Sequence, residues 1–439
     1  MTAIFRALGA ILFSTGVTMA ATLQQLDING IQIPVIYEDS SLVPTFNLTL
    51  VFRASGTLGI AKTGKHNGLV ASLASALLEE GTKELGSVKF AEELEQRAIS
   101  ISSNAGRENF TITLDSLIED VPDALTFLDS LLRSPNLSNK ALAKVQQDSI
   151  SDILQKESDF DAIASDNLLR ILFKGTPCAF IPDVPDVKKV KLKEIERFYK
   201  TNLVLNNLAI IAGGDLRFEE FARRIAPLLS RLKKGEKATI ATCPANADSQ
   251  SISATKPTEQ AYIYFGSPFV IGDYGTQNYK AKVAAFVLGT GGFGSRLMEE
   301  IRVKLGLAYS AYWYTAIAKS VVYATGYLQT KNESKDEAIE AVKKVIAEFV
   351  RNGITQDELD AAKKFLLGSE PLRHETLSQR LGRAYNAYYW GLPLDFGTTE
   401  LRHIESLTLD SINDYIKSHD EILRMSFSIV QAGGEDSGR

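Results

Sequence analysis

Two side chains late in the chain could act together on a carbonyl group. Arg302 and Tyr309 lie seven residues apart, and Gly306 between them can end a helix so that a strand beginning at Ala308 turns back. A guanidinium at a helix end and a phenol at the next strand can then meet at one point, where they would bind a carbonyl or a developing oxyanion. The alternative is an exposed helical arginine and a tyrosine that packs in a strand. From their residue types and spacing alone, a purely structural role for both residues is favoured.

The loop before this pair is rich in glycine. Its four glycines, which allow close approach of the backbone to a ligand or to another part of the protein, are Gly289, Gly291, Gly292 and Gly294. A Walker loop would end in Gly-Lys-Ser or Gly-Lys-Thr, whereas this loop continues into Ser295 and Arg296. We therefore expect no nucleotide site here.

A hydrolytic zinc site needs histidine, cysteine or carboxylate ligands that converge on one ion. The chain has four histidines, His66, His374, His403 and His419, and no two of them are four residues apart. No H-x-x-E-H or H-E-x-x-H is present, so we expect surface or hydrogen-bonded histidines and no metal site. The two cysteines, Cys178 and Cys243, could form one disulfide or none.

Composition narrows the class of protein. The chain has 439 residues, of which 45% are hydrophobic and 23% charged, and this predicts an ordinary globular protein of two or three domains. The chain has 48 basic and 53 acidic residues, and the resulting net charge of -5 disfavours nucleic acid as a partner. After the N-terminus, no stretch is apolar for the roughly 18 to 20 residues that a membrane span needs.

The N-terminus is typical of an export signal. One positive charge at Arg6 is followed by an apolar run from Ala7 to Phe13 and then by Thr18-Met19-Ala20, which has small residues at its two ends. We predict residues 1–21 as a signal peptide, cut after Ala20 or Ala21; the alternative is a buried N-terminal helix. The expected location is outside the cytoplasm, in the periplasm if the source is a Gram-negative bacterium.

The order of predicted elements repeats. Alternation and helical periodicity predict strands at 23–38 (a hairpin around Asn29-Gly30), 46–54, 99–105, 109–114, 261–265, 308–316 and 321–329, and helices at 65–78, 87–97, 121–132, 138–156, 278–288, 296–304, 335–351 and 355–367. Each half ends on a strand that runs into Gly-Gly, at Leu208 onward and at Phe427 onward. We therefore predict two homologous α+β domains, 22–232 and 260–439, each a largely antiparallel sheet with helices on one face, and a polar linker at 233–259.

The segment GSRLMEEIRVKLGLAYSAY, Gly294 to Tyr312, resembles the second-domain signature of the pitrilysin and mitochondrial processing peptidase family, the inverted zincins. Weaker similarity covers Gly68 to Thr82 and Trp390 to Phe396, and the resemblance as a whole runs from about Thr22 to Ala432. It implies that the chain forms half of a clam-shell. It also implies that Arg302 and Tyr309 bind substrate near the scissile bond.

The chain departs from this family at the zinc motif. The family's H-x-x-E-H falls on Ser72-Leu73-Ala74-Ser75-Ala76, so Ser72, Ser75 and Ala76 replace both histidines and the general base. The downstream zinc glutamate falls near Ser151-Asp152, which leaves Asp152 as the single carboxylate. These side chains cannot hold Zn²⁺ and activate a water, so we expect no cofactor in this chain.

The resemblance implies three functional hypotheses. The first is a non-catalytic partner subunit in a heterodimer, in which Arg302 and Tyr309 complete the active site of a homologous zinc-bearing peptidase chain. Zn²⁺ then belongs to that partner, the substrate is a peptide, and the loop Gly289 to Gly294 contacts substrate or gates its entry. The second is a degenerate homologue that binds peptides or acts as a scaffold, and the third a standalone metallopeptidase with an altered site. The retained Arg302 and Tyr309 favour the first, and a homodimer stays open.

Overall fold

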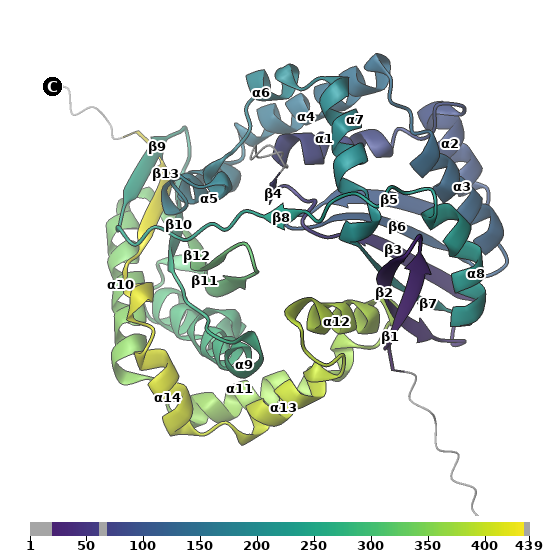
Figure 1. Ribbon diagram of the computed structural model, residues 1–439. Coiled ribbons are helices and arrows are strands. Elements are labelled where there is room, and N and C mark those ends of the chain that lie inside the picture. The colour runs from purple at the N-terminus through teal and green to yellow at the C-terminus, as the bar shows by residue number, and fades with distance from the viewer. Residues whose placement is uncertain (1–19, 61–67, 434–439) are drawn as a thin grey trace, which may run out of the picture.

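The computed structural model describes residues 20–60 and 68–433. Residues 1–19 of the predicted signal peptide, and also His66 and the predicted helix start at 65–67, lie outside the described residues. Figure 1 shows two units of mixed helix and sheet at opposite ends of the molecule. The predicted α+β class is confirmed.

The first sheet has six strands. Their order across the sheet is β1 (Thr22–Ile28), β2 (Ile31–Asp39), β7 (Leu208–Gly214), β3 (Thr45–Phe52), β6 (Phe110–Leu117) and β5 (Ser100–Ala105). Only the β2–β7 pair is parallel. Asn29 and Gly30 have φ of 54° and 77°, which suits the tight turn between β1 and β2 and confirms the predicted hairpin.

The second sheet repeats this topology with five strands. Their order is β11 (Ala308–Ile317), β12 (Val322–Lys331), β10 (Gln260–Pro268), β13 (Ser426–Gln431) and β9 (Ser251–Thr255). This matches the order β5-β6-β3-β7-β2 of the first sheet, and again only one pair, β9–β13, is parallel. The shared connectivity agrees with the duplication that the repeated element order predicts.

The segment 233–259, expected as a linker, contains two strands. β8 (Thr239–Ile240) pairs with β4 (Gly59–Ile60), and β9 is an edge strand of the second sheet. The second sheet therefore begins inside this segment. A short edge strand such as Ser-Ile-Ser-Ala-Thr alternates between exposed and half-buried residues, so its composition is that of a loop.

The helices of the first half pack on one face of their sheet. They are α1 (Gly68–Leu78), α2 (Gly86–Glu95), α3 (Val121–Arg133), α4 (Asn139–Lys156), α6 (Val184–Lys189), α7 (Leu192–Asn202) and α8 (Phe218–Leu229). The core between these helices and the sheet is built on fully buried rings and aliphatic chains that alternate along the strands, among them Phe46, Leu48, Leu50 and Phe52 of β3.

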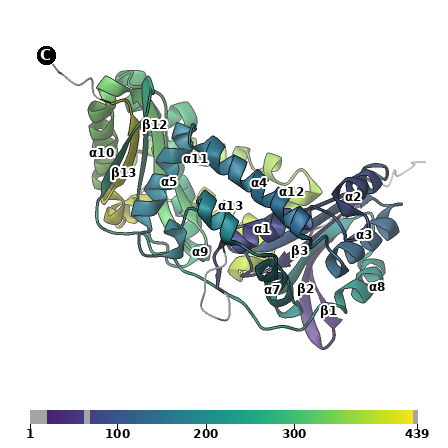
Figure 2. The ribbon, with the colours of Figure 1, turned by 90° about the horizontal axis from the view of Figure 1, so that it is seen from above.

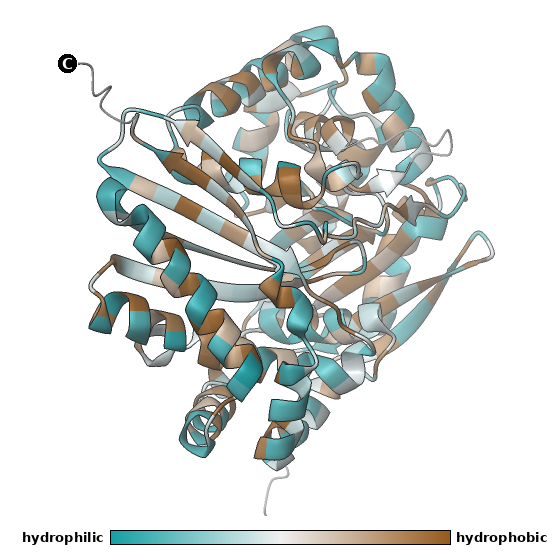
Figure 3. Cartoon of the chain, turned by 90° about the vertical axis from the view of Figure 1, so that its left-hand side faces the viewer, coloured by the Kyte–Doolittle hydropathy of each residue, from teal (hydrophilic) through white to brown (hydrophobic). Residues whose placement is uncertain are grey.

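The second half has a corresponding set. Its helices are α9 (Tyr274–Ala285), α10 (Lys335–Asn352), α11 (Gln356–Gly368), α13 (Phe396–Ser406) and α14 (Leu409–Lys417). Ile263 and Phe265 of β10 lie in its core with Phe349 of α10. The outer helices of this half carry polar residues interrupted by apolar stripes (Figure 3). In the described part of the chain, no helix is both long and apolar enough to span a bilayer.

Each half also covers the second face of the other half's sheet with one helix. α5 (Phe160–Leu172) packs on β10 and β13, where Asp161 accepts hydrogen bonds from Tyr264 Oη at 3.1 Å and from Gln329 Nε2 at 2.8 Å. α5 and α10 therefore lie on opposite faces of the second sheet (Figure 2). In return, α12 (Leu377–Trp390) packs on β2 and β7. The helices that belong to each half thus pack on one face of its sheet, as expected. In addition, one helix from the other half covers the second face.

A disulfide joins Cys178 of the first half to Cys243 of the segment 233–259, which answers the question that the sequence left open. It joins the turn after α5 to the segment before β9 and lies in a small apolar cluster with Phe173 and Tyr323. Nearby, Glu108 of the first half accepts a hydrogen bond from the backbone N–H of Ser320 at 2.6 Å. These contacts hold the halves in a defined arrangement.

Candidate functional site

Arg302 lies on a π-helical segment, Met298–Lys304. The backbone N–H of Leu305 donates to the carbonyl of Glu300 at 3.0 Å, which is the five-residue spacing of a π-turn. The predicted helix 296–304 therefore exists, but most of it winds wider than an α-helix. A second π-helical segment, Phe286–Thr290, follows α9. Periodicity cannot reveal such turns, because they depend on the packing around them.

Tyr309 lies at a β-bulge in edge strand β11. Ala308 pairs with Thr330 and Ala311 with Leu328, so three steps along β11 face two along β12. A bulge bends the strand and changes the direction of the side chains at the extra residue. The ring of Tyr309 is 80% exposed.

The two predicted residues meet in one cluster, to which the structure adds a third residue. The Arg302 guanidinium carbon lies 4.2 Å from the centre of the Tyr309 ring and 4.4 Å from that of the Phe293 ring. We call Phe293, Arg302 and Tyr309 the arginine–aromatic cluster. Within the described residues, Arg302 has no carboxylate partner. Stacking orients the guanidinium plane while its N–H groups stay available for an acceptor such as a peptide carbonyl.

An ion pair anchors the segment that carries the cluster. Arg296 donates from Nε and Nη2 to the two carboxylate oxygens of Glu358 on α11, both at 2.7 Å. Burial alone would raise the pKa of Glu358, but hydrogen bonds from Arg296 and Thr355 outweigh it and hold this pKa below its usual value. The bidentate geometry fixes the start of the Arg302 segment against the helical layer.

The four glycines of the loop differ in their surroundings. A Cβ on buried Gly289 would lie 2.3 Å from the backbone nitrogen of Trp313, so this glycine allows the loop to pack against β11. At Gly291 a Cβ would lie 2.7 Å from the carbonyl oxygen of Phe286. Gly292, with φ of 61°, and Gly294 have open space beside them and flank Phe293. Of the four glycines, only Gly292 and Gly294 are both adjacent in sequence to a residue of the arginine–aromatic cluster and beside open space that a ligand could occupy.

The positions of the degenerate zinc motif lie on α1. Ser72 Oγ donates to the carbonyl of Gly68 at 3.2 Å, and Ala76 is exposed. Ser75 is buried against edge strand β5, where its carbonyl accepts a hydrogen bond from Ser103 Oγ at 2.8 Å and the two hydroxyls lie 3.3 Å apart. The backbone N–H of Ser103 also donates to Glu79 at 3.0 Å. The general-base position, Ser75, therefore joins helix to strand, whereas the two ligand positions, Ser72 and Ala76, have no such contact with β5 among the described residues.

These residues do not fit a zinc ion. Two hydroxyls and a methyl are poor donors for Zn²⁺, and Asp152 is an exposed residue of α4. Among the described residues, no group of three histidine, cysteine, aspartate or glutamate side chains could hold a metal. Of the described histidines, His419 pairs with Glu421 at 2.7 Å, His374 lies 3.9 Å from Glu370 and His403 lies beside Tyr279.

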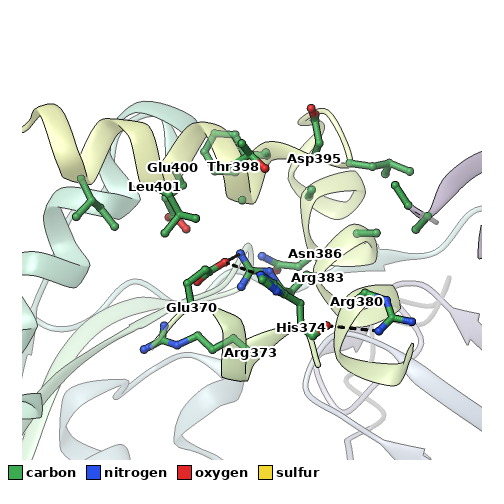
Figure 4. Close-up of a pocket in the computed structure, with 18 of the residues that line it drawn as sticks. Glu370, Arg373, His374, Arg380, Arg383, Asn386, Asp395, Thr398, Glu400 and Leu401 are labelled. Carbon is green, nitrogen blue, oxygen red and sulfur yellow. Dashed lines mark hydrogen bonds and ion pairs between the residues drawn. The ribbon is translucent and has the colours of Figure 1, made fainter. Parts of the chain in front are cut away.

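The sequence did not reveal a cavity of about 720 Å³ that is lined by residues of α12, of α13 and of the turn before α12 (Figure 4). Ion pairs line it: Glu38 with Arg380, Glu370 with Arg383 and Glu400 with Lys282. Glu38 and Arg380 are 342 residues apart in the sequence, so no local pattern could have connected them.

Comparison with known proteins agrees with these observations. Residues 60–180 match the family profile described as insulinase (peptidase family M16), and residues 189–366 match the peptidase M16 inactive domain. A protein of Helicobacter pylori described as the non-peptidase homolog YmxG is 44% identical over 420 residues, which are 95% of this chain and 96% of the relative.

Two solved structures share the fold. The peptidase M16 inactive domain from Pseudomonas fluorescens superposes with a TM-score of 0.84 at 23% identity, over 94% of this chain and 98% of that one. The periplasmic protease PqqL from Escherichia coli gives a TM-score of 0.77 at 12% identity, over 99% of this chain and 49% of that one. The two family profiles and the relative of 44% identity show that the chain belongs to peptidase family M16.

Proposed function

We propose that this chain is the partner subunit of a zinc-bearing M16 peptidase and that Arg302 and Tyr309 complete the active site of that peptidase. The observation that carries this proposal is the arginine–aromatic cluster, in which a stacked guanidinium has no acid of its own among the described residues. A guanidinium held in this way can bind the carbonyl of a peptide or the charge that develops on it during hydrolysis.

The absence of zinc ligands on α1 supports a division of labour. Ser72, Ser75 and Ala76 leave this chain without a metal to activate water, so Zn²⁺ and the general base belong to the partner. PqqL is named a protease and is about twice as long as this chain, which superposes on 49% of it. A chain of this length therefore corresponds to one half of such a molecule, and we propose that the partner supplies the other half of a clam-shell.

Export is part of the same proposal. The N-terminal residues are typical of a signal peptide, and the Cys178–Cys243 disulfide suits an oxidising compartment. We propose that the chain acts outside the cytoplasm, in the periplasm if its source is Gram-negative. The peptide substrate and the partner would then meet it there.

The test combines this chain with an H-x-x-E-H chain from the same genome. We would measure bound zinc, complex formation, and cleavage of an unstructured fluorogenic peptide by each chain and by the mixture. We expect cleavage by the mixture, with zinc on the partner. Arg302→Ala should lower kcat/KM by about 10²- to 10³-fold, as loss of one oxyanion donor does. The matched control is Lys304→Ala, because Lys304 lies on the same π-helical segment and pairs with Glu300.

Each other outcome has a distinct meaning. Stoichiometric zinc and chelator-sensitive cleavage by this chain alone would overturn the proposal in favour of a standalone peptidase. A stable complex whose activity responds equally to Arg302→Ala and Lys304→Ala would overturn the role of the cluster and favour a peptide-binding or scaffold protein.

A further inference from the structure

A buried carboxylate oxygen without a hydrogen-bond donor lies at the cavity of Figure 4. Glu38 of β2 is 1% exposed and lines this cavity. Its Oε1 accepts from Arg380 Nε at 2.8 Å and Nη2 at 2.7 Å, whereas its Oε2 has no partner among the described residues. Leaving a charged oxygen buried without a donor is destabilising, so the site fits a cationic donor.

Five basic side chains line the cavity, and each contacts a group other than Glu38 Oε2: Arg373 donates to Ser369 Oγ at 3.3 Å, and His374 lies 3.9 Å from Glu370. Arg380 also donates through Nη1 to the carbonyl of Glu375 at 2.9 Å. Arg383 pairs with Glu370, and Lys282 pairs with Glu400 at 2.6 Å. A donor for Glu38 Oε2 must therefore come from another part of the chain or from outside it.

The start of β1 lies beside Glu38. Thr22 pairs with Tyr37 in the β1–β2 ladder, so continuing this antiparallel register by one residue places Ala21 opposite Glu38. Opposed residues of such a pair have Cα atoms roughly 4.5 to 5.5 Å apart. Ala20 and Ala21 line the same cavity as Glu38, and Ala21 packs against the apolar cluster that contains Ile36. Because side chains alternate along a strand, Ile36 and Glu38 point to this same face.

We propose that a leader peptidase cuts the Ala20–Ala21 bond and that the new amino group of Ala21 becomes the donor to Glu38 Oε2. Hydrolysis adds one water: its oxygen goes to the Ala20 carbonyl carbon, which leaves as a carboxylate, and the Ala21 nitrogen becomes an ammonium. An ammonium brings a positive charge and three N–H donors, where the uncut chain has one neutral amide. The inference rests on the export proposed above, since the leader must be removed.

N-terminal sequencing of the chain purified from the periplasm of a Gram-negative host is the first measurement. The expected first residue is Ala21. A chain that stays uncut would overturn the proposed export and this inference with it. Cleavage at a different bond would overturn this inference and leave the export standing.

A cycle of variants tests the ion pair itself. The chain is produced to begin at Ala21 with a free amine, or with Gly-Ser added before Ala21, each as wild type and as Glu38→Gln. We expect the free amine to raise Tm by about 2 °C in the wild type and not in Glu38→Gln. Glu370→Gln is the matched control, because Glu370 lies in the same cavity on another partner, and it should keep the difference.

Two further arms keep the result interpretable. If Glu38→Gln fails to fold, acetylation of the Ala21 amine replaces it, and should lower Tm to that of the extended chain. Methylammonium tests an external source of the same chemistry. If methylammonium raises the Tm of the chain that begins at Ala21, and Glu38→Gln abolishes this effect, then Glu38 Oε2 is still without a donor and the proposal is overturned. Equal Tm values for the wild-type chains with and without the Gly-Ser extension would overturn it as well.

Discussion

Corresponding regions of the two halves share a topology and differ in chemistry. In the first half, edge strand β5 is tied to α1 through Ser103 and Ser75, at the positions of the zinc motif. In the second half, the equivalent edge strand β11 has a bulge, and Tyr309 there stacks on Arg302 of a π-helical segment. The polar groups of the first region form hydrogen bonds within the chain, whereas the second region leaves the Arg302 guanidinium and the rings of Phe293 and Tyr309 at the surface.

The two regions should therefore contribute to different properties, the first to the stability of the chain and the second to its function in a complex. Buried groups such as Ser75 stabilise the chain that contains them. Phe293 and Tyr309 are 66% and 80% exposed, so they bury little apolar area within this chain. Substitutions in the first region should therefore change folding, and substitutions in the arginine–aromatic cluster should change only the activity of a complex.

The largest effect should come from the packing that supports the cluster. Gly289→Ala places a Cβ against the backbone of Trp313, which cannot move without shifting β11, so we expect a loss of about 3 kcal/mol in the free energy of unfolding. Denaturant unfolding monitored by circular dichroism measures it. Gly294→Ala is the control, since a Cβ there meets open space. Equal stabilities of the two variants would show that the loop does not depend on this close packing.

A charge in the closed first region should have the next largest effect. Ser75→Glu places a carboxylate at a buried position beside Ser103 and should cost about 2 kcal/mol. Ser72→Glu, one turn earlier on the exposed side of α1, should stay within about 0.5 kcal/mol of wild type. Urea unfolding measures the change in the free energy of unfolding for both variants. If the two variants unfold alike, the region is more open than its hydrogen bonds indicate.

The anchor of the Arg302 segment should show a pH dependence. Glu358→Gln removes the acceptor charge for Arg296, and we expect a loss of about 1.5 kcal/mol at pH 7. Because folding lowers the pKa of Glu358, its contribution is present above the ordinary pKa of 4.5 and is lost as the pH falls through the lowered value. Wild type and variant should therefore converge in stability as the pH falls below the lowered pKa of Glu358. A difference that is constant from pH 7 to pH 3 would contradict this assignment.

The phenol of Tyr309 should have the smallest effect of the four. In the mixture with a zinc-bearing chain, Tyr309→Phe keeps the ring over Arg302 and removes only the hydroxyl. We expect kcat/KM to fall about tenfold, or roughly 1.4 kcal/mol, with unchanged Tm. Tyr314→Phe is a suitable control, since Tyr314 is another partly exposed tyrosine of β11. Unchanged kcat/KM in Tyr309→Phe would limit this residue to orienting Arg302.

Local sequence predicted most of the elements and the class of fold. Period-two alternation located β3 and β6, the Asn29-Gly30 turn located the first hairpin, and the two Gly-Gly strand ends indicated the repeat. Strand β9, which is short and polar, was expected as part of a linker, and no helix was predicted over α5, α7, α8, α12, α13 or α14. Such signals are readable because each depends on residues that are neighbours in the sequence.

The sequence by itself also determined that zinc ligands are missing from α1, and it identified Arg302 and Tyr309 as a pair. Only the tertiary structure decided the exchange of α5 and α12, whether Cys178 and Cys243 form a disulfide, the π-turns and bulge that bring Phe293 to the pair, and the buried Glu38 oxygen that lacks a donor among the described residues. Each of these depends on packing between segments far apart in the chain. Side-chain type states which groups are present, whereas long-range packing decides what surrounds them.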